Sequence, residues 1–166
     1  MIESREQNAR SLALLALERV EKDRAYLDRL VDQTLKNSAL RPEERGLFTE
    51  LSYGVVRHQR LLDFYLEQYL DRKIFKLDLA TRSLLRLGAY QILCLDRIPG
   101  PAAVNESVKL SAPRAKGLIN AVLRRISENK NTLKQPDQIS NPVTRLGVKY
   151  SHPDLERLLA HCPSDI

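Results

Sequence analysis

The sequence has 166 residues, of which 43% are hydrophobic and 29% charged, and its formal net charge is +6. This length suits one domain, or one domain with a tail, and the hydrophobic share is large enough for a packed core, which excludes wholesale disorder. Leu outnumbers Val and Ile together, 29 to 17, and Trp is absent. That bias favours helices over strands.

Two cysteines, Cys94 and Cys162, are too few for a disulfide scaffold or for a zinc site built from cysteines, and they indicate a reducing compartment. The longest apolar run, residues 12–17, is too short to cross a membrane, and the first residues contain no signal-peptide core. We therefore expect a soluble, cytoplasmic, helical protein.

Apolar residues recur at helical spacing along most of the chain. The pattern predicts helices at about 9–20 and 27–35, and a third that begins at Pro42, a favoured first helical residue, and is broken near His58. It continues at about 78–95, 102–112 and 113–129. With the break, this makes about seven helices joined by short loops.

The segment 78–95 is the most hydrophobic of these helices. Ten of the sixteen residues from Ala80 to Leu95 are apolar and lie nearly all round the helix, which predicts a central position in a bundle. Gly88 within it costs about 1 kcal/mol relative to Ala, so we expect another helix to cross closely there. Cys94, in the same helix, is expected to behave as a small buried hydrophobe.

The composition changes after this helical region. Pro136, Pro142 and Gly147 interrupt every period, so residues 130–150 are predicted to be a linker. Ser151 then resembles the cap of a short helix within 151–166. We interpret 1–129 as the helical domain and 151–166 as the start of a segment that belongs to a longer protein.

The positive charge is concentrated between Lys109 and Lys134. That stretch holds seven basic residues and one acid, Glu128, so it accounts for the excess of the whole chain. Such a stretch favours polyanions as partners, although a solvated helix face is the simpler alternative. Lys116, Asn120 and Arg124 follow one another at four-residue spacing and so form one polar stripe.

The predicted RNA-binding residues extend from that stripe. Basic side chains contact phosphates, and an Asn amide can recognise a base edge or a sugar hydroxyl. For Asn120, a hydrogen bond between helices is an equally good explanation, and the apolar neighbours of Asn105 favour a structural role for that residue. The full set is Arg5, Arg10, Lys109, Arg114, Lys116, Asn120, Arg124 and Arg125.

No catalytic or metal-binding pattern is evident. The glycines form neither a dinucleotide-binding nor a phosphate-binding loop, and the three histidines lack the spacing of metal ligands on a shared helix. Asp28 and Asp32 share a helix face, but their charged surroundings indicate a solvated surface. We assign no catalytic residue, no metal and no cofactor to this chain.

Four motifs resemble, in order, those of the NusB-type RNA-binding fold, in the version at the start of the RsmB (Fmu/Sun) ribosomal RNA 5-methylcytosine methyltransferases. They are LSYGVVRH at 51–58, LRLGAYQIL at 85–93, IP at 98–99 with AVNESV at 103–108, and NAVLRR at 120–125. The tail YSHP at 150–153 also resembles that family, although Asp154 occupies a position where Trp is usual.

The resemblance implies a seven-helix, all-α domain in two sub-bundles that precedes a catalytic domain dependent on S-adenosylmethionine. The cofactor loop and catalytic cysteines of the family lie in that later domain, so the implied partners are ribosomal RNA and a methyltransferase domain in the same polypeptide. Free-standing NusB proteins act in transcription antitermination through an arginine-rich first helix, of which only Arg5 and Arg10 are present here. Two alternatives are a free-standing antitermination factor of this kind and a protein-docking module without RNA binding, including a homodimer.

Overall fold

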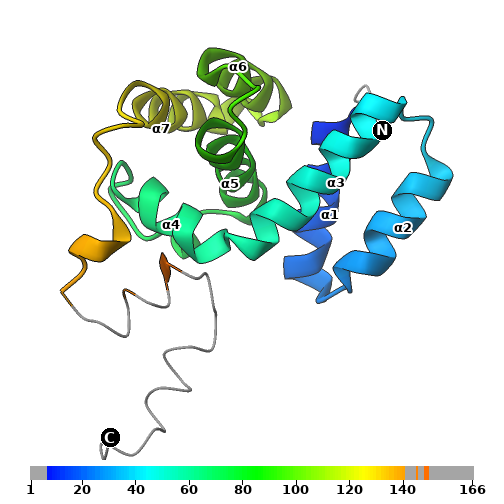
Figure 1. The fold of residues 1–166 in the computed structure, drawn as a ribbon, viewed down its shortest axis with the longest axis horizontal. Helices are drawn as coiled ribbons and strands as arrows, with labels where there is room; N and C mark the ends of the chain where they lie inside the picture. The colour runs from blue at the N-terminus through cyan, green and yellow to red at the C-terminus, as the bar shows by residue number, and fades with distance from the viewer. Residues whose placement is uncertain (1–6, 141–144, 146–147, 150–166) are drawn as a thin grey trace, which may run out of the picture.

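The fold is described from a computed structural model, which covers residues 7–140, 145, 148 and 149. Within these residues the chain forms helices and no strand, so the predicted all-α fold with seven α-helices is confirmed (Figure 1). The α-helices are α1 (Ala9–Asp23), α2 (Leu27–Asn37), α3 (Pro42–Arg57), α4 (Gln59–Glu67), α5 (Leu79–Cys94), α6 (Gly100–Leu110) and α7 (Lys116–Glu128). Two short 3₁₀ turns lie between α-helices, η1 (Ile74–Lys76) before α5 and η2 (Pro113–Ala115) before α7, and a third, η3 (Pro136–Gln138), follows α7.

Local signals fix where several helices begin and end. Asn8 caps α1 through a reciprocal pair of hydrogen bonds with Ser11, which satisfies backbone N–H groups that the first turn leaves free. Pro42 is the first residue of α3, and α3 gives way to α4 at His58, as predicted. Asp78 caps α5 by accepting hydrogen bonds from the backbone N–H and the hydroxyl of Thr81.

The helices form two sub-bundles. Figure 1 shows α1, α2 and α3 gathered on one side and α4, α6 and α7 on the other, with α5 between the two groups. α5 packs against α1, α3, α4, α6 and α7, and Leu85 and Leu87 on it are fully buried. The predicted central position of this helix is therefore confirmed.

At Gly88, α5 lies in close contact with both α6 and α7. A Cβ atom at Gly88 would overlap the side chain of Leu123 on α7 and would lie 2.8 Å from the Ser107 hydroxyl on α6. The close crossing predicted at this glycine is confirmed. The cost of a glycine within a helix is thus offset by the close packing of Leu123 and Ser107 against α5, which a larger residue at this position would prevent.

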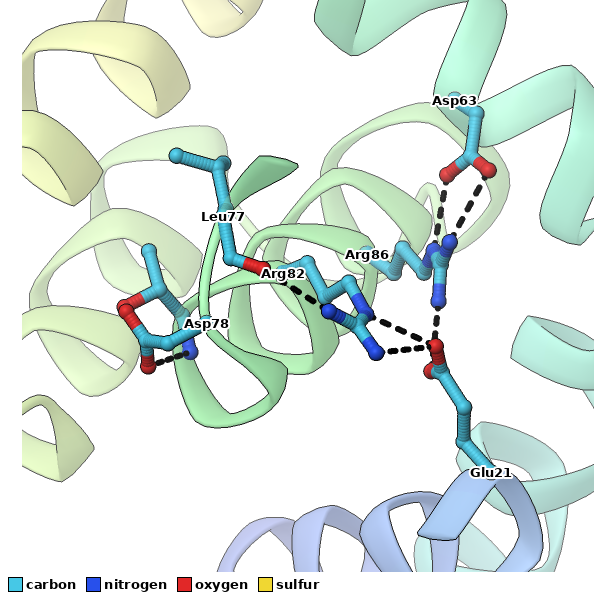
Figure 2. A network of polar contacts seen from close by, with 7 residues as sticks. Glu21, Asp63, Leu77, Asp78, Arg82 and Arg86 are labelled. Atoms are coloured by element: carbon cyan, nitrogen blue, oxygen red, sulfur yellow. Dashed lines mark hydrogen bonds and ion pairs between the residues drawn. The ribbon is translucent and has the colours of Figure 1, made fainter. Parts of the chain in front are cut away.

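A partly buried ionic network, centred on Arg86, joins the two sub-bundles (Figure 2). The Arg86 side chain on α5, only 7% exposed, donates to both carboxylate oxygens of Asp63 on α4 at 2.7 and 3.0 Å. It also donates to Glu21 at the end of α1 at 3.0 Å, and Arg82 pairs with the same Glu21 at 2.6 Å. Burial raises the pKa of Asp63, while the hydrogen bonds from Arg86 oppose that rise.

Residues that follow α7 fold back onto α4. Leu133 is buried, the side-chain amide of Gln68 exchanges two hydrogen bonds with the backbone of Lys134, and the Tyr65 hydroxyl donates to Gln135 at 2.9 Å. Residues 133–135 of the predicted linker are therefore held against the helical domain. The helix predicted within 151–166 lies outside the described residues.

One expectation about the core is wrong. Cys94 is the last residue of α5 and is exposed, so it is not the small buried hydrophobe that its position in an apolar helix suggested. At this end of α5, Ile92 and Leu95 remain buried, and Cys94 lies on the side of the helix that faces solvent. Within the described part of the chain, no helix has both the length and the apolar character that a membrane crossing requires.

Candidate nucleic-acid interface

Helices α6 and α7 lie side by side in opposite directions, because the first residue of α6, Gly100, meets Ser127 near the end of α7. α7 buries one stripe of side chains against the core, namely Ile119, Val122, Leu123 and Ile126. At about 100° per residue, the polar residues Lys116, Asn120 and Arg124 lie beside that stripe, toward α6. The packing of α7 thus leaves its polar stripe at the junction with α6.

A surface groove follows this junction, and we call it the α6–α7 groove. It comprises two adjoining hollows of about 260 and 660 Å³, and both are lined by Asn105 of α6 and Asn120 of α7. The smaller hollow is completed by Pro101, Val104, Arg124, Ser127 and Glu128. The larger is completed by Ala102, Glu106, Val108, Lys109, Lys116 and Gly117.

The structure brings half of the eight predicted site residues into this groove: Lys109, Lys116, Asn120 and Arg124. The other described members lie elsewhere. Arg114 is on the η2 turn with a loose ion pair to Asp78 at 3.9 Å, and Arg125 is exposed but lines neither hollow. Arg10 donates a hydrogen bond to Gln91 of α5 at 2.6 Å, and Arg5 lies outside the described residues.

Two carboxylates of the groove pair with its cations. Lys109 lies 2.7 Å from Glu106, and Arg124 lies 3.8 Å from Glu128. Both pairs join neighbouring turns of one helix and are largely exposed, so each contributes little to stability and can open for another anion. Lys116 has no ion pair among the described residues.

The two asparagines face the groove from opposite walls. Within the described residues, neither Asn105 nor Asn120 makes a side-chain hydrogen bond, so the interhelical bond considered for Asn120 is not formed there. The structural role expected for Asn105 is wrong, because the residue is exposed. Its neighbours Ala103 and Val104 are buried, but each step along a helix turns the side chain by about 100°.

A second polar hollow, of about 460 Å³, lies on the exposed face of α3 and includes Tyr53, Arg57 and Tyr90. Its polar groups are largely engaged within the protein. The Tyr90 hydroxyl donates to Glu50 at 2.7 Å, and burial together with this bond raises the pKa of Tyr90. Arg45 donates to the Leu35 carbonyl oxygen at 2.7 Å, so this hollow offers fewer free donors than the α6–α7 groove.

Asp28 and Asp32 lie exposed at the surface, as expected from the sequence. Asp28 accepts a hydrogen bond from the Tyr53 hydroxyl at 2.6 Å, and this bond raises the pKa of Tyr53. Asp32 pairs with Lys36 at 2.8 Å in an exposed contact of adjacent turns. Among the described residues, His, Cys, Asp and Glu do not gather in any group of three that could hold a metal ion.

Comparison with known proteins places these features in a family. The model of the NusB family matches residues 7–128. The structure of T. maritima NusB covers 72% of this chain and 88% of its own chain with a TM-score of 0.66, at 20% identity, and this likeness concerns the fold. The NusB-like arrangement predicted from the four motifs is therefore confirmed.

Two relatives at higher identity carry the same name. The "probable ribosomal RNA small subunit methyltransferase B" of Synechocystis is 42% identical over 155 residues, and that of Bacillus subtilis is 36% identical over 151 residues. Each alignment covers 89% of this chain and 33% of the relative. The chain therefore spans about a third of the length of the curated relatives it matches.

Proposed function

Because this chain belongs to the NusB family, we propose that it is an RNA-binding accessory domain, which holds ribosomal RNA for a cytosine-5 methyltransferase domain of the same polypeptide. The single observation that carries this proposal is the α6–α7 groove, in which Lys109, Lys116 and Arg124 surround two free amides. Exposed Lys and Arg side chains bind phosphates, and amides recognise bases or sugars.

The relatives support the methyltransferase part of the proposal. Both are named as ribosomal RNA methyltransferases, and this chain aligns with about a third of each. A domain that binds the substrate while another performs the chemistry would need no catalytic residue of its own. The S-adenosylmethionine that methyl transfer consumes would then be bound by the methyltransferase domain, and an action on ribosomal RNA implies a cytoplasmic location.

Fluorescence anisotropy of this chain with a labelled ribosomal RNA hairpin, at two salt concentrations, tests the proposal. Three cationic contacts to a single-stranded region predict a log–log salt slope of roughly −2. An unrelated RNA of equal length shows whether the domain discriminates. The double variant Lys116→Glu/Arg124→Glu should reduce the affinity by at least tenfold, because it replaces two attractive charges by repulsive ones.

The matched control is Lys22→Glu/Arg29→Glu, which makes the same change of net charge on α1 and α2. If the two double variants lose affinity equally, the groove is not the binding site. If the unmodified chain binds neither RNA near 100 mM salt, RNA binding itself is refuted, and docking to a catalytic domain becomes the better function for this surface.

A further inference from the structure

The two asparagines of the α6–α7 groove give it a chemistry that phosphate binding does not require. Each carboxamide carries an acceptor oxygen and two N–H donors, and within the described residues Asn105 and Asn120 leave all of these unused. Polar groups that face each other across a groove without internal partners can be satisfied by a ligand with both donors and acceptors. The edge of a nucleobase is such a ligand, whereas a phosphate offers acceptors alone.

The smaller hollow has a lining that suits one base. The Pro101 ring and Val104 provide apolar surface, and Asn105, Asn120 and Ser127 provide polar groups. Its volume of about 260 Å³ lies below the roughly 300–1,000 Å³ of pockets that enclose whole drug-sized ligands. A single planar group fits this size better than a stacked pair.

The charges favour a single strand over a duplex. The groove holds three cations, Lys109, Lys116 and Arg124, but also two carboxylates, Glu106 and Glu128. A duplex would bring two dense rows of phosphates toward those carboxylates, while one strand places phosphates only at either side of an inserted base. In addition, bases in a duplex have their pairing edges occupied, whereas an unpaired base can be turned out and recognised.

We infer that the α6–α7 groove receives an unpaired nucleotide of single-stranded RNA. The base lies between the amides of Asn105 and Asn120, and the flanking phosphates contact Lys109 and Lys116 at one end and Arg124 at the other. This inference rests on the proposed function and specifies its ligand. Asn105 and Asn120 recognise the base, while the three cations contribute affinity without regard to sequence.

The test uses this chain with labelled 12-nucleotide strands of oligo-A, oligo-C and oligo-U, and with the A·U duplex of the same length. We expect at least one single strand to bind roughly tenfold or more tightly than the duplex, and the three strands to differ in affinity. Asn105→Ala and Asn120→Ala should each weaken binding of the preferred strand by roughly five- to tenfold and bring the three affinities together. Lys116→Glu should weaken all three strands by a similar factor.

Asn131→Ala is the matched control, because Asn131 is exposed and lines neither hollow. Circular dichroism of each variant excludes loss of the fold. A duplex that binds as tightly as the strands would overturn the inference, as would asparagine variants that keep the unmodified affinities and their spread. In both cases the proposed function stands if Lys116→Glu/Arg124→Glu still reduces the RNA affinity by at least tenfold. The absence of any RNA binding by the unmodified chain would instead refute the proposed function itself.

Discussion

Arg86 and Asp63 form a two-pronged ion pair inside the protein, with N–O distances of 2.7 and 3.0 Å, where the Arg86 side chain is only 7% exposed (Figure 2). The guanidinium also holds Glu21 of α1, so one buried cation connects three helices. Taking these charges out of water is expensive, so the network need not stabilise the fold more than apolar packing would. Removal of only one partner of the Arg86–Asp63 pair is expected to lower the stability, because the other charge is then buried without its partner.

Asp63→Ala is expected to destabilise the fold by roughly 3 kcal/mol, at the low end of the range for a broken buried pair because Glu21 still contacts Arg86. Urea unfolding followed by circular dichroism measures the free energy of unfolding. Asp32→Ala, which removes one partner of the exposed pair with Lys36, serves as the control and should cost less than about 0.5 kcal/mol. Equal losses in the two variants would show that burial of the Arg86 pair has no energetic consequence.

Gly88→Ala should destabilise the protein by roughly 1–3 kcal/mol, because the added methyl group would overlap Leu123 and crowd Ser107 at the crossing of three helices. Gly46→Ala is the opposite case. A Cβ at Gly46, within α3, would meet no atom within 4 Å, so this variant should gain about 0.5–1 kcal/mol from helix propensity. Melting temperatures of the two variants should therefore move in opposite directions, and a shift of the same sign in both would contradict the packing at Gly88.

Asp78 gives a cap whose strength depends on pH. Burial opposes ionisation of Asp78, but hydrogen bonds from Thr81 and the charge of Arg114 outweigh it and hold the pKa of Asp78 below its ordinary value. Because the pKa is lowered in the folded chain, the carboxylate contributes stability above the ordinary carboxyl pKa. That contribution is lost as the pH falls through the folded-state pKa.

Asp78→Ala should therefore cost about 1 kcal/mol near neutral pH, and the difference from the unmodified protein should shrink in acid. Asp78→Asn keeps an acceptor for the Thr81 N–H but cannot ionise, so it should retain part of the stability with less change between the two conditions. Urea unfolding at neutral and acidic pH measures both effects. A cost of Asp78→Ala that is independent of pH would mean that the negative charge of the cap contributes nothing.

Structural features that depend on residues close together in the sequence, such as helix ends, could be predicted from the sequence. Pro42 marks the start of α3, His58 marks its end, and Gly88 marks a close helix crossing, since each acts through backbone conformation or apolar spacing. The burial of Arg86 could not be predicted in this way. Its partners Asp63 and Glu21 are 23 and 65 residues away, and no local pattern shows that the fold brings them together.

The candidate groove was predictable on one wall only. Lys116, Asn120 and Arg124 follow a regular spacing on α7, which places them on one face of a helix whatever its neighbours are. Asn105 belongs to the opposite wall, and its side chain could be assigned to solvent only once the orientation of α6 against α5 and α7 was known. A helical period gives relative directions around one axis, but it does not say which direction faces another helix.

Arg124 and Arg125 provide the strictest test of the groove, because they have the same chemistry and are adjacent on α7. Only Arg124 lines a hollow of the groove, while Arg125 is exposed about 100° further round the helix. Since long-range attraction of RNA is nearly the same for both, a difference between Arg124→Ala and Arg125→Ala reports local contact. We expect Arg124→Ala to weaken binding of a single-stranded RNA about three- to tenfold and to make the salt slope shallower by about 0.7, and Arg125→Ala to change the affinity less than twofold. Anisotropy titrations at several salt concentrations give both quantities, and equal effects of the two variants would mean that RNA contacts the outer face of α7 instead of the groove.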